Sequence, residues 1–324
     1  MTPQFGFAMT CPITSDPMAA ADVIRRGGLV ALPTETVYGL GANAWDGEAV
    51  ARIFAAKERP AFDPLIVHLP GIAALNQVAT SISPRAHQLA DAFWPGPLTL
   101  VLPKQPKVSD LVTSGLPTVG VRVPAHPLMQ SVLKLAGVPI AAPSANRFGR
   151  LSPTTAEHVR EQLGDRIDLI LDGGPCPVGV ESTIVFVDGD TTTILRPGGL
   201  AVEAIAGIAG PVEIATGSSD RPAAPGMLAS HYAPRTPIDI VTTPPVVPSG
   251  ARWGLLQFVS GEAVGYAAVE TLSVSGRLEE AAANFFAALH RLDRAGLDRI
   301  LATPFPENGL GRALNDRLRR ATTR

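Results

Sequence analysis

The residues best suited to chemistry begin in a short stretch that holds two hydroxyls, a carboxylate and a phenol directly after an apolar segment. Residues 33–41 read PTETVYGLG, and Lys57 and Arg59 follow at the end of the next predicted helix. Two cations at a helix C-terminus gain some stabilisation from the helix dipole, and they also form a strong clamp for phosphate oxygens. Both features favour an anion-binding site, although an ordinary strand-to-helix connection and a solvated helix end would have the same pattern.

Two more polar residues stand in apolar strand patterns. Arg122 lies in VGVRVP, where a permanent charge is costly unless it is paired or solvated in a cleft, and a carboxylate-bearing ligand is one such partner. His68 ends PLIVH, and a lone histidine there is more often a structural hydrogen-bonding group than a ligand. Because no second His or Cys stands at metal-ligand spacing, the sequence predicts no metal site formed by the protein.

Two polar loops follow predicted strands farther along the chain, and a third polar segment comes after them. APSAN at 142–146 offers backbone amides, the Ser144 hydroxyl and the Asn146 amide, which can bind an adenylate without covalent chemistry. VEST at 180–183 and LRPG at 195–198 add further polar groups. Each loop alone could be an ordinary connection, so their functional meaning depends on whether the fold brings them together.

Composition limits the class of protein. The chain has 324 residues, 46% hydrophobic and 17% charged, with a net charge of −2, which excludes a disordered chain and a global basic field for nucleic acid. The two cysteines form neither a metal-ligand pair nor a disulfide framework and favour a reducing compartment. No apolar run reaches the roughly 18 residues of a membrane span, and no signal-peptide pattern occurs. We therefore expect a cytoplasmic protein without a membrane partner.

Alternating strand and helix patterns place these residues. A helix beginning at Asp16-Pro17 precedes the apolar strand 29–32, so residues 33–41 are expected to be a loop at the end of that strand. Apolar residues at helical spacing put Lys57 in a last turn before Pro60. Strands are expected at 65–69, 98–102, 119–123, 139–142 and 169–172, with a helix from Ser83-Pro84 to Phe93. The pattern predicts an α/β fold with its ligands at strand ends.

A second unit is expected beyond a linker. Residues 216–237 are rich in Gly, Ser, Pro and Asp, whereas strands at 238–241, 254–258 and 299–302 and a helix at 278–292 resume the α/β pattern. We predict a first domain at 1–215, a linker at 216–237 and a small Rossmann-like domain at 238–324.

The order of the motifs carries more weight than any one of them. PTETVYGLG, KERP, PLIVH, VGVRVP, APSAN, SPTT, VEST and LRPG occur in this order from position 33 to 198, and HYAP occurs at 231–234. The chain thereby resembles the threonylcarbamoyl-AMP synthase family of YrdC-like proteins, in its long two-domain form. The resemblance implies a twisted open α/β sheet with a positively charged cavity, followed by a linker and a smaller Rossmann-like domain.

The resemblance also implies roles for matching residues. Four would be the catalytic positions: Lys57, Arg59, Ser144 and Asn146. Five would bind L-threonine: Thr36, His68, Arg122, Ala142 and Ser182. Seven would hold ATP: Arg59, Asp63, Thr118, Ser144, Ser152, Arg196 and Tyr232. Tyr232, on the linker, would belong to a lid over the cavity that excludes water from a labile intermediate.

The implied activity is that of a nucleotidyltransferase. L-threonine, bicarbonate and ATP, with Mg²⁺, would give threonylcarbamoyl-AMP and pyrophosphate, the first step in forming threonylcarbamoyladenosine beside the tRNA anticodon. A tRNA threonylcarbamoyl transferase would receive the intermediate, and direct tRNA binding is possible but not required. Two departures from the family pattern, Asp63 where Asn is common and Phe148 where a small polar residue is usual, bear on nucleotide affinity.

Two rival functions are weaker on the sequence. An RNA-binding module would be expected to carry a basic charge and exposed aromatic residues, and the near-neutral chain lacks that pattern. A carbamoyltransferase of hydrogenase maturation contains a similar domain but also cysteine-rich zinc fingers, which two distant cysteines cannot supply.

Overall fold

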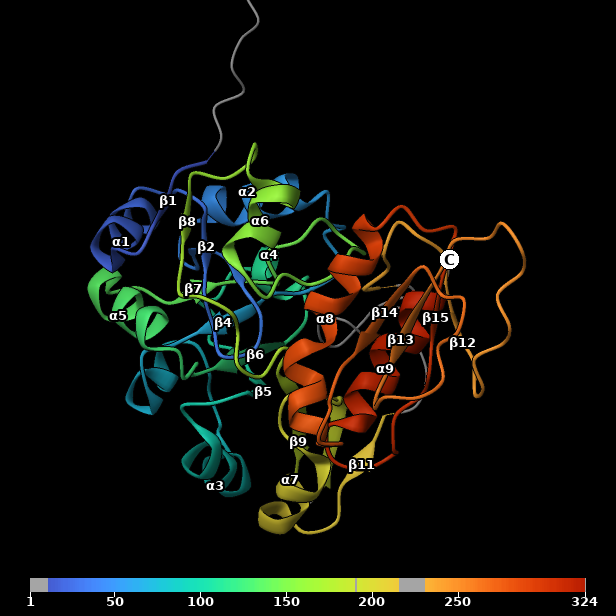
Figure 1. Ribbon diagram of the computed structural model, residues 1–324. Coiled ribbons are helices and arrows are strands. Elements are labelled where there is room, and N and C mark those ends of the chain that lie inside the picture. The colour runs from blue at the N-terminus through green and yellow to red at the C-terminus, as the bar shows by residue number, and fades with distance from the viewer. Residues whose placement is uncertain (1–10, 190, 216–230, 324) are drawn as a thin grey trace, which may run out of the picture.

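One large mixed sheet carries the first unit of the protein. The structure is a computed structural model, and it describes residues 11–189, 191–215 and 231–323 (Figure 1). The sheet order is β1-β8-β2-β3-β7-β4-β6-β5-β9-β10-β11. Its strands are β1 (Ile13–Thr14), β2 (Val30–Leu32), β3 (Gly39–Asn43), β4 (Ile66–His68), β5 (Leu98–Pro103), β6 (Thr118–Arg122), β7 (Ile140–Ala141), β8 (Leu169–Leu171), β9 (Thr183–Asp188), β10 (Thr191–Arg196) and β11 (Glu213–Ile214).

Helices cover both faces of this sheet because alternate strand residues point to opposite sides. Val30 and Leu32 pack against α1 and α5, whereas Leu29 and Ala31 join the larger core on the other face with α2 and α6 (Figure 1). The described helices of this unit are α1 (Pro17–Arg25), α2 (Gly47–Lys57), η1 (Ile72–Gln77), α3 (Pro84–Phe93), α4 (Asp110–Thr113), α5 (Pro127–Ala136), α6 (Ala156–Leu163) and α7 (Val202–Ala209). The mixed α/β fold predicted from the sequence is confirmed.

Local caps fix the ends of the helices as predicted. The Asp16 carboxylate accepts from the Met18 amide at 2.9 Å, and the Ser83 hydroxyl accepts from the Ala86 amide at 3.2 Å. Helix α2 ends at Lys57 because Glu58 adopts the left-handed conformation with φ of 55°. This ending places Lys57 in the last helical turn and Arg59 just beyond it.

The loop predicted at 33–41 is too long, which corrects the sequence-based expectation. Strand β3 begins at Gly39 and runs antiparallel to β2, with Leu32 paired to Gly39 and Val30 to Gly41. A Cβ atom on Gly41 would lie 2.6 Å from Leu32 Cδ1 and 2.9 Å from Ile140 Cγ2. The glycines therefore allow tight strand packing here, and only 33–38 connect the two strands.

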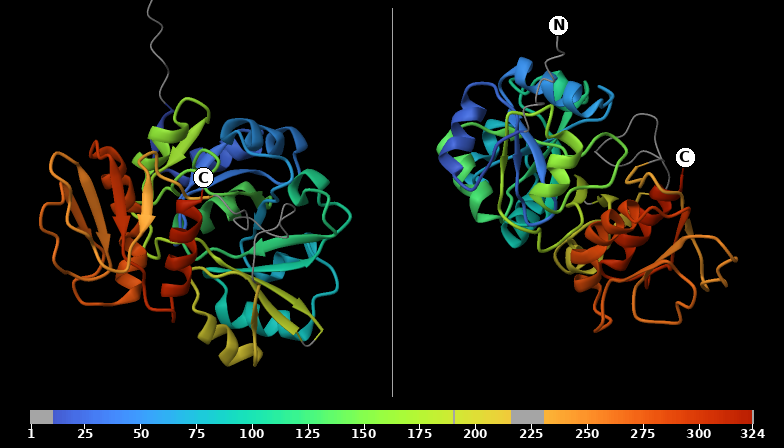
Figure 2. Two further views of the ribbon diagram at one scale, coloured as in Figure 1. Left: turned by 90° about the vertical axis from the view of Figure 1, so that its right-hand side faces the viewer. Right: turned by 45° about the horizontal axis from the view of Figure 1, so that its top comes forward.

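A second, smaller sheet forms the C-terminal unit. Its four strands are all parallel in the order β12-β15-β13-β14, comprising β12 (Ile238–Ile240), β13 (Trp253–Gln257), β14 (Ala268–Thr271) and β15 (Arg299–Ala302). Helices α8 (Leu278–Arg294) and α9 (Gly311–Thr322) accompany it, and α8 lies between the two sheets (Figures 1 and 2). No helix in the described part of the chain combines the length and apolar character needed to cross a membrane.

The predicted linker at 216–237 falls mostly outside the described residues, because the structure describes only 231–237 of it. This short piece contacts both units. The Ala233 amide donates to the Gly149 carbonyl of the first unit at 2.8 Å, and the His231 amide donates to the Arg320 carbonyl of α9 at 3.3 Å. The HYAP segment is thereby fixed between the two sheets.

Candidate functional site

A pocket forms where several strands of the large sheet end. His68 closes β4, Arg122 closes β6 and Arg196 closes β10, while loops after β2 and β7 supply the other walls. The polar and charged residues around it are Thr34, Thr36, Arg59, His68, Arg122, Ser144, Glu181, Ser182, Arg196, His231 and Tyr232. Motifs that are spread along the chain between Thr34 and Tyr232 thus contribute to one pocket. No single motif predicts this arrangement.

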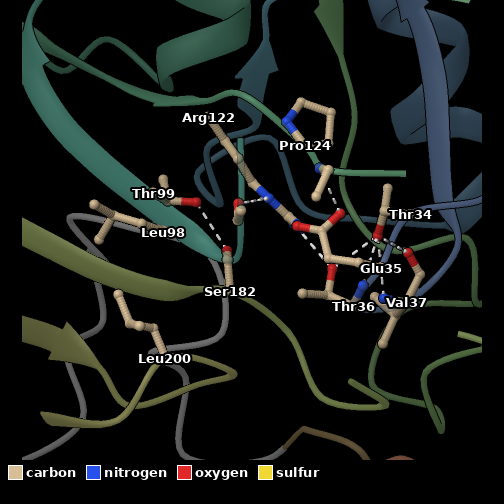
Figure 3. Close-up of polar contacts among 12 residues, drawn as sticks. Thr34, Glu35, Thr36, Val37, Leu98, Thr99, Arg122, Pro124, Ser182 and Leu200 are labelled. Atoms are coloured by element: carbon tan, nitrogen blue, oxygen red, sulfur yellow. Dashed lines mark hydrogen bonds and ion pairs between the residues drawn. The ribbon is translucent and has the colours of Figure 1, made fainter. Parts of the chain in front are cut away.

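Arg122 is held by the chain itself at one end of the pocket (Figure 3). Its Nη2 donates to the Glu35 carboxylate, its Nη1 donates to Thr36 Oγ1 at 2.9 Å, and its Nε donates to the Gly96 carbonyl at 3.1 Å. Glu35 Oε2 also accepts from the Ala125 amide at 2.9 Å. A guanidinium has five N–H donors, so these three bonds leave two for a ligand.

Burial and charge set the ionisation of this end of the pocket. Burial opposes ionisation of Glu35, but the Arg122 charge and hydrogen bonds outweigh it and lower the pKa of the carboxyl. Burial, reinforced by the Arg122 charge, lowers the pKa of His68 to about 3. His68 is therefore neutral at physiological pH, and its Nδ1 has no hydrogen-bond partner among the described residues.

Ser182 links this end to the opposite wall. Its hydroxyl lies 2.8 Å from Thr99 Oγ1 (Figure 3), and Arg196 Nη2 donates to the Ser182 carbonyl at 2.8 Å. Arg196 is 4% exposed and extends from the end of β10. The Ser182 loop thus joins β5, through Thr99, to the buried guanidinium of Arg196.

Lys57 lies beneath the pocket and is absent from its lining. Its side chain is 1% exposed, and Nζ donates to the Ser144 carbonyl at 2.5 Å and to the Asn146 carbonyl. Burial, followed by the Arg59 charge, lowers its pKa well below the usual lysine range. The ammonium fixes the backbone of the Ser144 to Asn146 loop, so its contact with a ligand would go through that loop or require local movement.

Arg59 reaches the pocket, whereas Asp63 stays behind it. Arg59 Nη2 lies 2.9 Å from Asp63 Oδ2, and the guanidinium also donates to the backbone carbonyls of Asp63 and Pro64. The ion contact lacks hydrogen-bond geometry, since neither carboxylate oxygen of Asp63 has a hydrogen-bond partner among the described residues. Burial raises the pKa of Asp63, and the charges of Arg59, Lys57 and Arg196 partly offset this effect.

Tyr232 closes the wall of the pocket that Arg196 lines. It is 1% exposed and adopts a φ of 64°, which is uncommon for a residue with a side chain. His231 packs against it at 4.1 Å between ring centroids, and Phe148 meets His231 edge-on at 5.9 Å. Phe148, which departs from the family pattern, therefore supports the HYAP segment.

Five residues predicted for the site do not line the pocket: Lys57, Asp63, Thr118, Asn146 and Ser152. Thr118 begins β6, at the end opposite to Arg122, and lines a separate small cavity with Leu65 and Thr99. Ser152 is fully buried and donates to Glu181 Oε1 at 2.5 Å. The other residues predicted to bind threonine or nucleotide all face one pocket.

Sequence reasoning missed three charged residues of the site. Glu35 and Glu181 stand inside recognised motifs, but their partners, Arg122 and Arg317, are distant in the chain. Arg317 lies on α9 with an exposure of 0%; helical spacing puts it on the buried face with Leu314 and Leu318, but this spacing does not identify its partner. Only the three-dimensional pairing identifies these residues.

No group of three or more His, Cys, Asp or Glu residues able to hold a metal ion occurs in the described ranges. The carboxylates in and behind the pocket wall are already paired: Glu35 with Arg122, Asp63 with Arg59 and Glu181 with Arg317. Each of these three carboxylates therefore already has a cationic partner in the protein.

Comparison with known proteins gives a consistent identity over nearly the whole chain. The Sua5, YciO and YrdC family model, described as "Telomere recombination", matches residues 22–198, and the model "Threonylcarbamoyl-AMP synthase, C-terminal domain" matches residues 200–323. The threonylcarbamoyl-AMP synthase of Pyrococcus abyssi is 45% identical, covering 94% of this chain and 93% of its own. That of Bacillus subtilis is 42% identical, covering 95% and 94%.

A solved structure extends the likeness to three dimensions. The crystal structure of P. abyssi Sua5 complexed with L-threonine is 42% identical, with a TM-score of 0.90, covering 96% of this chain and 97% of its own. The chain therefore belongs to the threonylcarbamoyl-AMP synthase family.

Proposed function

We propose that this protein makes threonylcarbamoyl-AMP and pyrophosphate from L-threonine, bicarbonate and ATP. The observation that carries the proposal is a single pocket that joins a carboxylate-binding end around Arg122 to a second cationic end around Arg59 and Arg196. The likeness to named synthases over both units supports this reaction, as does the likeness to P. abyssi Sua5, which was solved in complex with L-threonine.

L-threonine is proposed to occupy the Arg122 end. The two remaining Arg122 donors suit its carboxylate, because a planar guanidinium can form parallel bonds to both oxygens. Neutral His68 and the hydroxyls of Thr36 and Ser182 can hydrogen-bond the substrate amine and hydroxyl. Ala142, which also lines the pocket, leaves room for the methyl group.

ATP is proposed to occupy the other end. Arg59 and Arg196 face the phosphates, the Ser144 loop supplies further donors, and Tyr232 covers the nucleotide. Three predicted residues act from behind the lining by holding groups that face the pocket. Lys57 holds the Ser144 carbonyl, Asp63 pairs with Arg59, and Ser152 donates to Glu181. Thr118 keeps its proposed nucleotide role only if β6 or its neighbours move on binding.

The chemistry proposed needs no protein nucleophile. The threonine amine and bicarbonate form a carbamate and release water. A carbamate oxygen then forms a bond to the α-phosphorus of ATP, and the bond from that phosphorus to pyrophosphate breaks. Positioning and stabilisation of negative charge would supply the catalysis, as in other nucleotidyl transfers. Mg²⁺ is expected to arrive as part of the Mg–ATP substrate, bound mainly by phosphate oxygens and water.

The product is a labile mixed anhydride, so its handling matters. We propose that Tyr232 and the HYAP segment exclude water from it, and that a tRNA threonylcarbamoyl transferase in the cytoplasm consumes it. Direct tRNA binding by this chain is not needed for that sequence of reactions.

A substrate screen tests the proposal. The purified protein is incubated with Mg–ATP, bicarbonate and each amino acid in turn, and pyrophosphate and adenylate are measured. We expect release of both products with threonine, little with serine, and none when bicarbonate is removed. Release independent of threonine would reject the proposal, and salt-sensitive tRNA binding without ATP consumption would favour an RNA-binding protein instead.

A further inference from the structure

Arg317 is the largest side chain buried completely among the described residues, and it comes from the C-terminal unit. It lies in the middle of α9 with an exposure of 0%. A permanently charged guanidinium is rarely buried to this extent, because removing it from water is costly unless partners replace the water. Its partners therefore indicate why the sequence places an arginine here.

One of those partners, Glu181, belongs to the wall of the pocket. Arg317 Nε donates to Glu181 Oε2 at 2.8 Å, and Nη1 donates to Asp316 at 2.5 Å on the same helix. Glu181 lines the pocket, and its other oxygen accepts from Ser152 Oγ at 2.5 Å. Burial opposes ionisation of Glu181, but the Arg317 and Arg196 charges outweigh it and lower its pKa. The charged pair thus spans the two units.

Arg317 also contacts the linker residue that covers the pocket. Its Cζ atom lies 4.9 Å from the centroid of the Tyr232 ring, a distance at which a cation is attracted to the ring face. Phe286 of α8 packs on the same ring at 5.8 Å. Because Tyr232 has a positive φ and its hydroxyl lacks a partner among the described residues, these ring contacts are its main side-chain anchors.

Arg317 also influences Arg196, which is proposed to face the phosphates, through the backbone of Glu181 and Ser182. Glu181 precedes Ser182, whose carbonyl accepts from Arg196 Nη2 at 2.8 Å. A shift of Glu181 would therefore move the backbone that orients Arg196. Two groups of the nucleotide end, the Tyr232 cover and, through the Ser182 carbonyl, Arg196, depend on one guanidinium from α9.

We propose that Arg317 is a positioning residue for ATP, and that the C-terminal unit completes the nucleotide end of the pocket through it. This inference rests on the proposed function for the identity of the nucleotide. It gives the small α/β unit a task in the reaction itself. The pocket groups that Arg317 supports, Tyr232 directly and Arg196 through the Glu181–Ser182 backbone, are assigned to the nucleotide end, so threonine binding should depend on this residue far less.

The test compares substitutions of Arg317, on the buried face of α9, with a substitution of Arg319, on its exposed face. Arg317→Met keeps the length of the side chain and removes the charge, and Arg317→Lys keeps the charge but loses the planar group. Arg319→Met is the matched control, because the Arg319 side chain is 59% exposed and pairs with the surface residue Glu307. Each variant is assayed for kcat, for KM of ATP and of threonine, and for its thermal unfolding midpoint.

We expect Arg317→Met to raise the KM for ATP on the order of tenfold or more, with the KM for threonine within about twofold of the wild type. The KM for ATP of Arg317→Lys should lie between those of Arg317→Met and the wild type. Arg319→Met should have the same KM values as the wild type. A purely structural role would reduce the active fraction and leave both KM values unchanged. That result, or equal increases in both KM values, would overturn the proposal.

A binding measurement separates this inference from the proposed function. ATP binding to each folded variant is measured by calorimetry without threonine or bicarbonate. If the wild type binds ATP but makes no adenylate, the proposed function fails, while weaker ATP binding by Arg317→Met still supports the positioning role. If Arg317→Met does not fold, the double variant Glu181→Gln/Arg317→Met removes both buried charges, and normal ATP affinity in that variant would overturn the role of the pair.

Discussion

The two ends of the pocket are built in different ways. At the end proposed for threonine, Arg122, Thr36 and Ser182 come from the large sheet and its loops and are held by hydrogen bonds within that unit. At the nucleotide end, Tyr232 comes from the linker and its support comes from α9, while the Tyr232 hydroxyl and both Asp63 carboxyl oxygens have no hydrogen-bond partner among the described residues. One end is built within the first unit, and the other is assembled from that unit, the linker and α9.

This difference suggests that the binding of each ligand depends on a different part of the protein. A site whose groups are all held within one unit needs little rearrangement to bind its ligand. A site that depends on a linker and a second unit can open, admit a large nucleotide and close over a labile product. We therefore expect perturbations of the sheet to affect threonine, and perturbations of the linker or α9 to affect ATP.

The largest effect should come from Lys57, because it holds the loop that both ends share. Lys57→Met removes the donor to the Ser144 and Asn146 carbonyls and leaves these buried groups without it. We expect threonine- and bicarbonate-dependent pyrophosphate release to fall by roughly a thousandfold or more. The exposed Lys134→Met is the control. Near-normal turnover by folded Lys57→Met would show that Lys57 is not needed.

The next effect should separate the two ends. Glu35→Gln keeps the shape of the side chain but removes the charge that pairs with Arg122, so the guanidinium loses its fixed orientation. We expect kcat/KM for threonine to fall about a hundredfold, with the KM for ATP within a few-fold of the wild type. Steady-state kinetics with each substrate varied in turn checks this, and a loss confined to ATP would reverse the assignment of the ends.

Tyr232→Ala should produce the opposite pattern. Removing the ring deletes the cover of the nucleotide end and its contacts with Arg317 and Phe286. We expect the KM for ATP to rise roughly tenfold and more of the adenylate to be hydrolysed, while threonine binding is retained. Pyrophosphate and intact adenylate are measured together, and an unchanged ratio of the two would argue against a cover that excludes water.

The smallest effect concerns the contact between the units. His158 of α6 and His290 of α8 stack with their centroids 3.8 Å apart, and His290 Nε2 lies 3.2 Å from the Ser152 carbonyl. Burial, followed by the charges of His290 and nearby arginines, lowers the pKa of His158 to about 3, and burial lowers the pKa of His290 to about 4. Both rings are neutral in the folded protein at physiological pH.

Since unfolding restores pKa values near 6.5, the unfolded chain binds more protons below that pH, and stability falls as the pH decreases from about 6.5 toward 4. Each such histidine contributes up to about 1.4 kcal/mol per pH unit to this slope. We expect His290→Phe to flatten the acid limb of the free energy of unfolding by about that amount. Denaturant titrations across pH check it, with exposed His87→Gln as control; identical slopes would refute the assignment.

The sequence predicts the threonine end better because its residues stand at the ends of recognisable strands. His68 and Arg122 each stand in a predicted strand, so the arrangement of strands brings these two together, whereas Ser182 is identified only through the family resemblance. Glu35 is recognisable as polar but has no role in the sequence pattern, since its partner Arg122 lies on another strand and the pairing has no local signal. The strand at Gly39 escapes prediction because glycines normally indicate a turn.

The nucleotide end shows the limit of sequence reasoning more clearly. Tyr232 and Arg196 are identified only through the family resemblance, and Arg317 has no motif at all. Its burial depends on the docking of α9 against the pocket wall, which is a tertiary event involving both units. Lys57 and Ser152, predicted to belong to the site, do not line the pocket in this structure and contact groups that do.

Calorimetry with crossed ligands and variants tests the division of the pocket most directly. L-threonine and ATP are each titrated into the wild type, Glu35→Gln and Tyr232→Ala. We predict that Glu35→Gln loses threonine affinity and keeps ATP affinity, whereas Tyr232→Ala keeps threonine affinity and loses ATP affinity. If each variant weakens both ligands equally, the pocket is one coupled unit, and the division into two separately built ends is wrong.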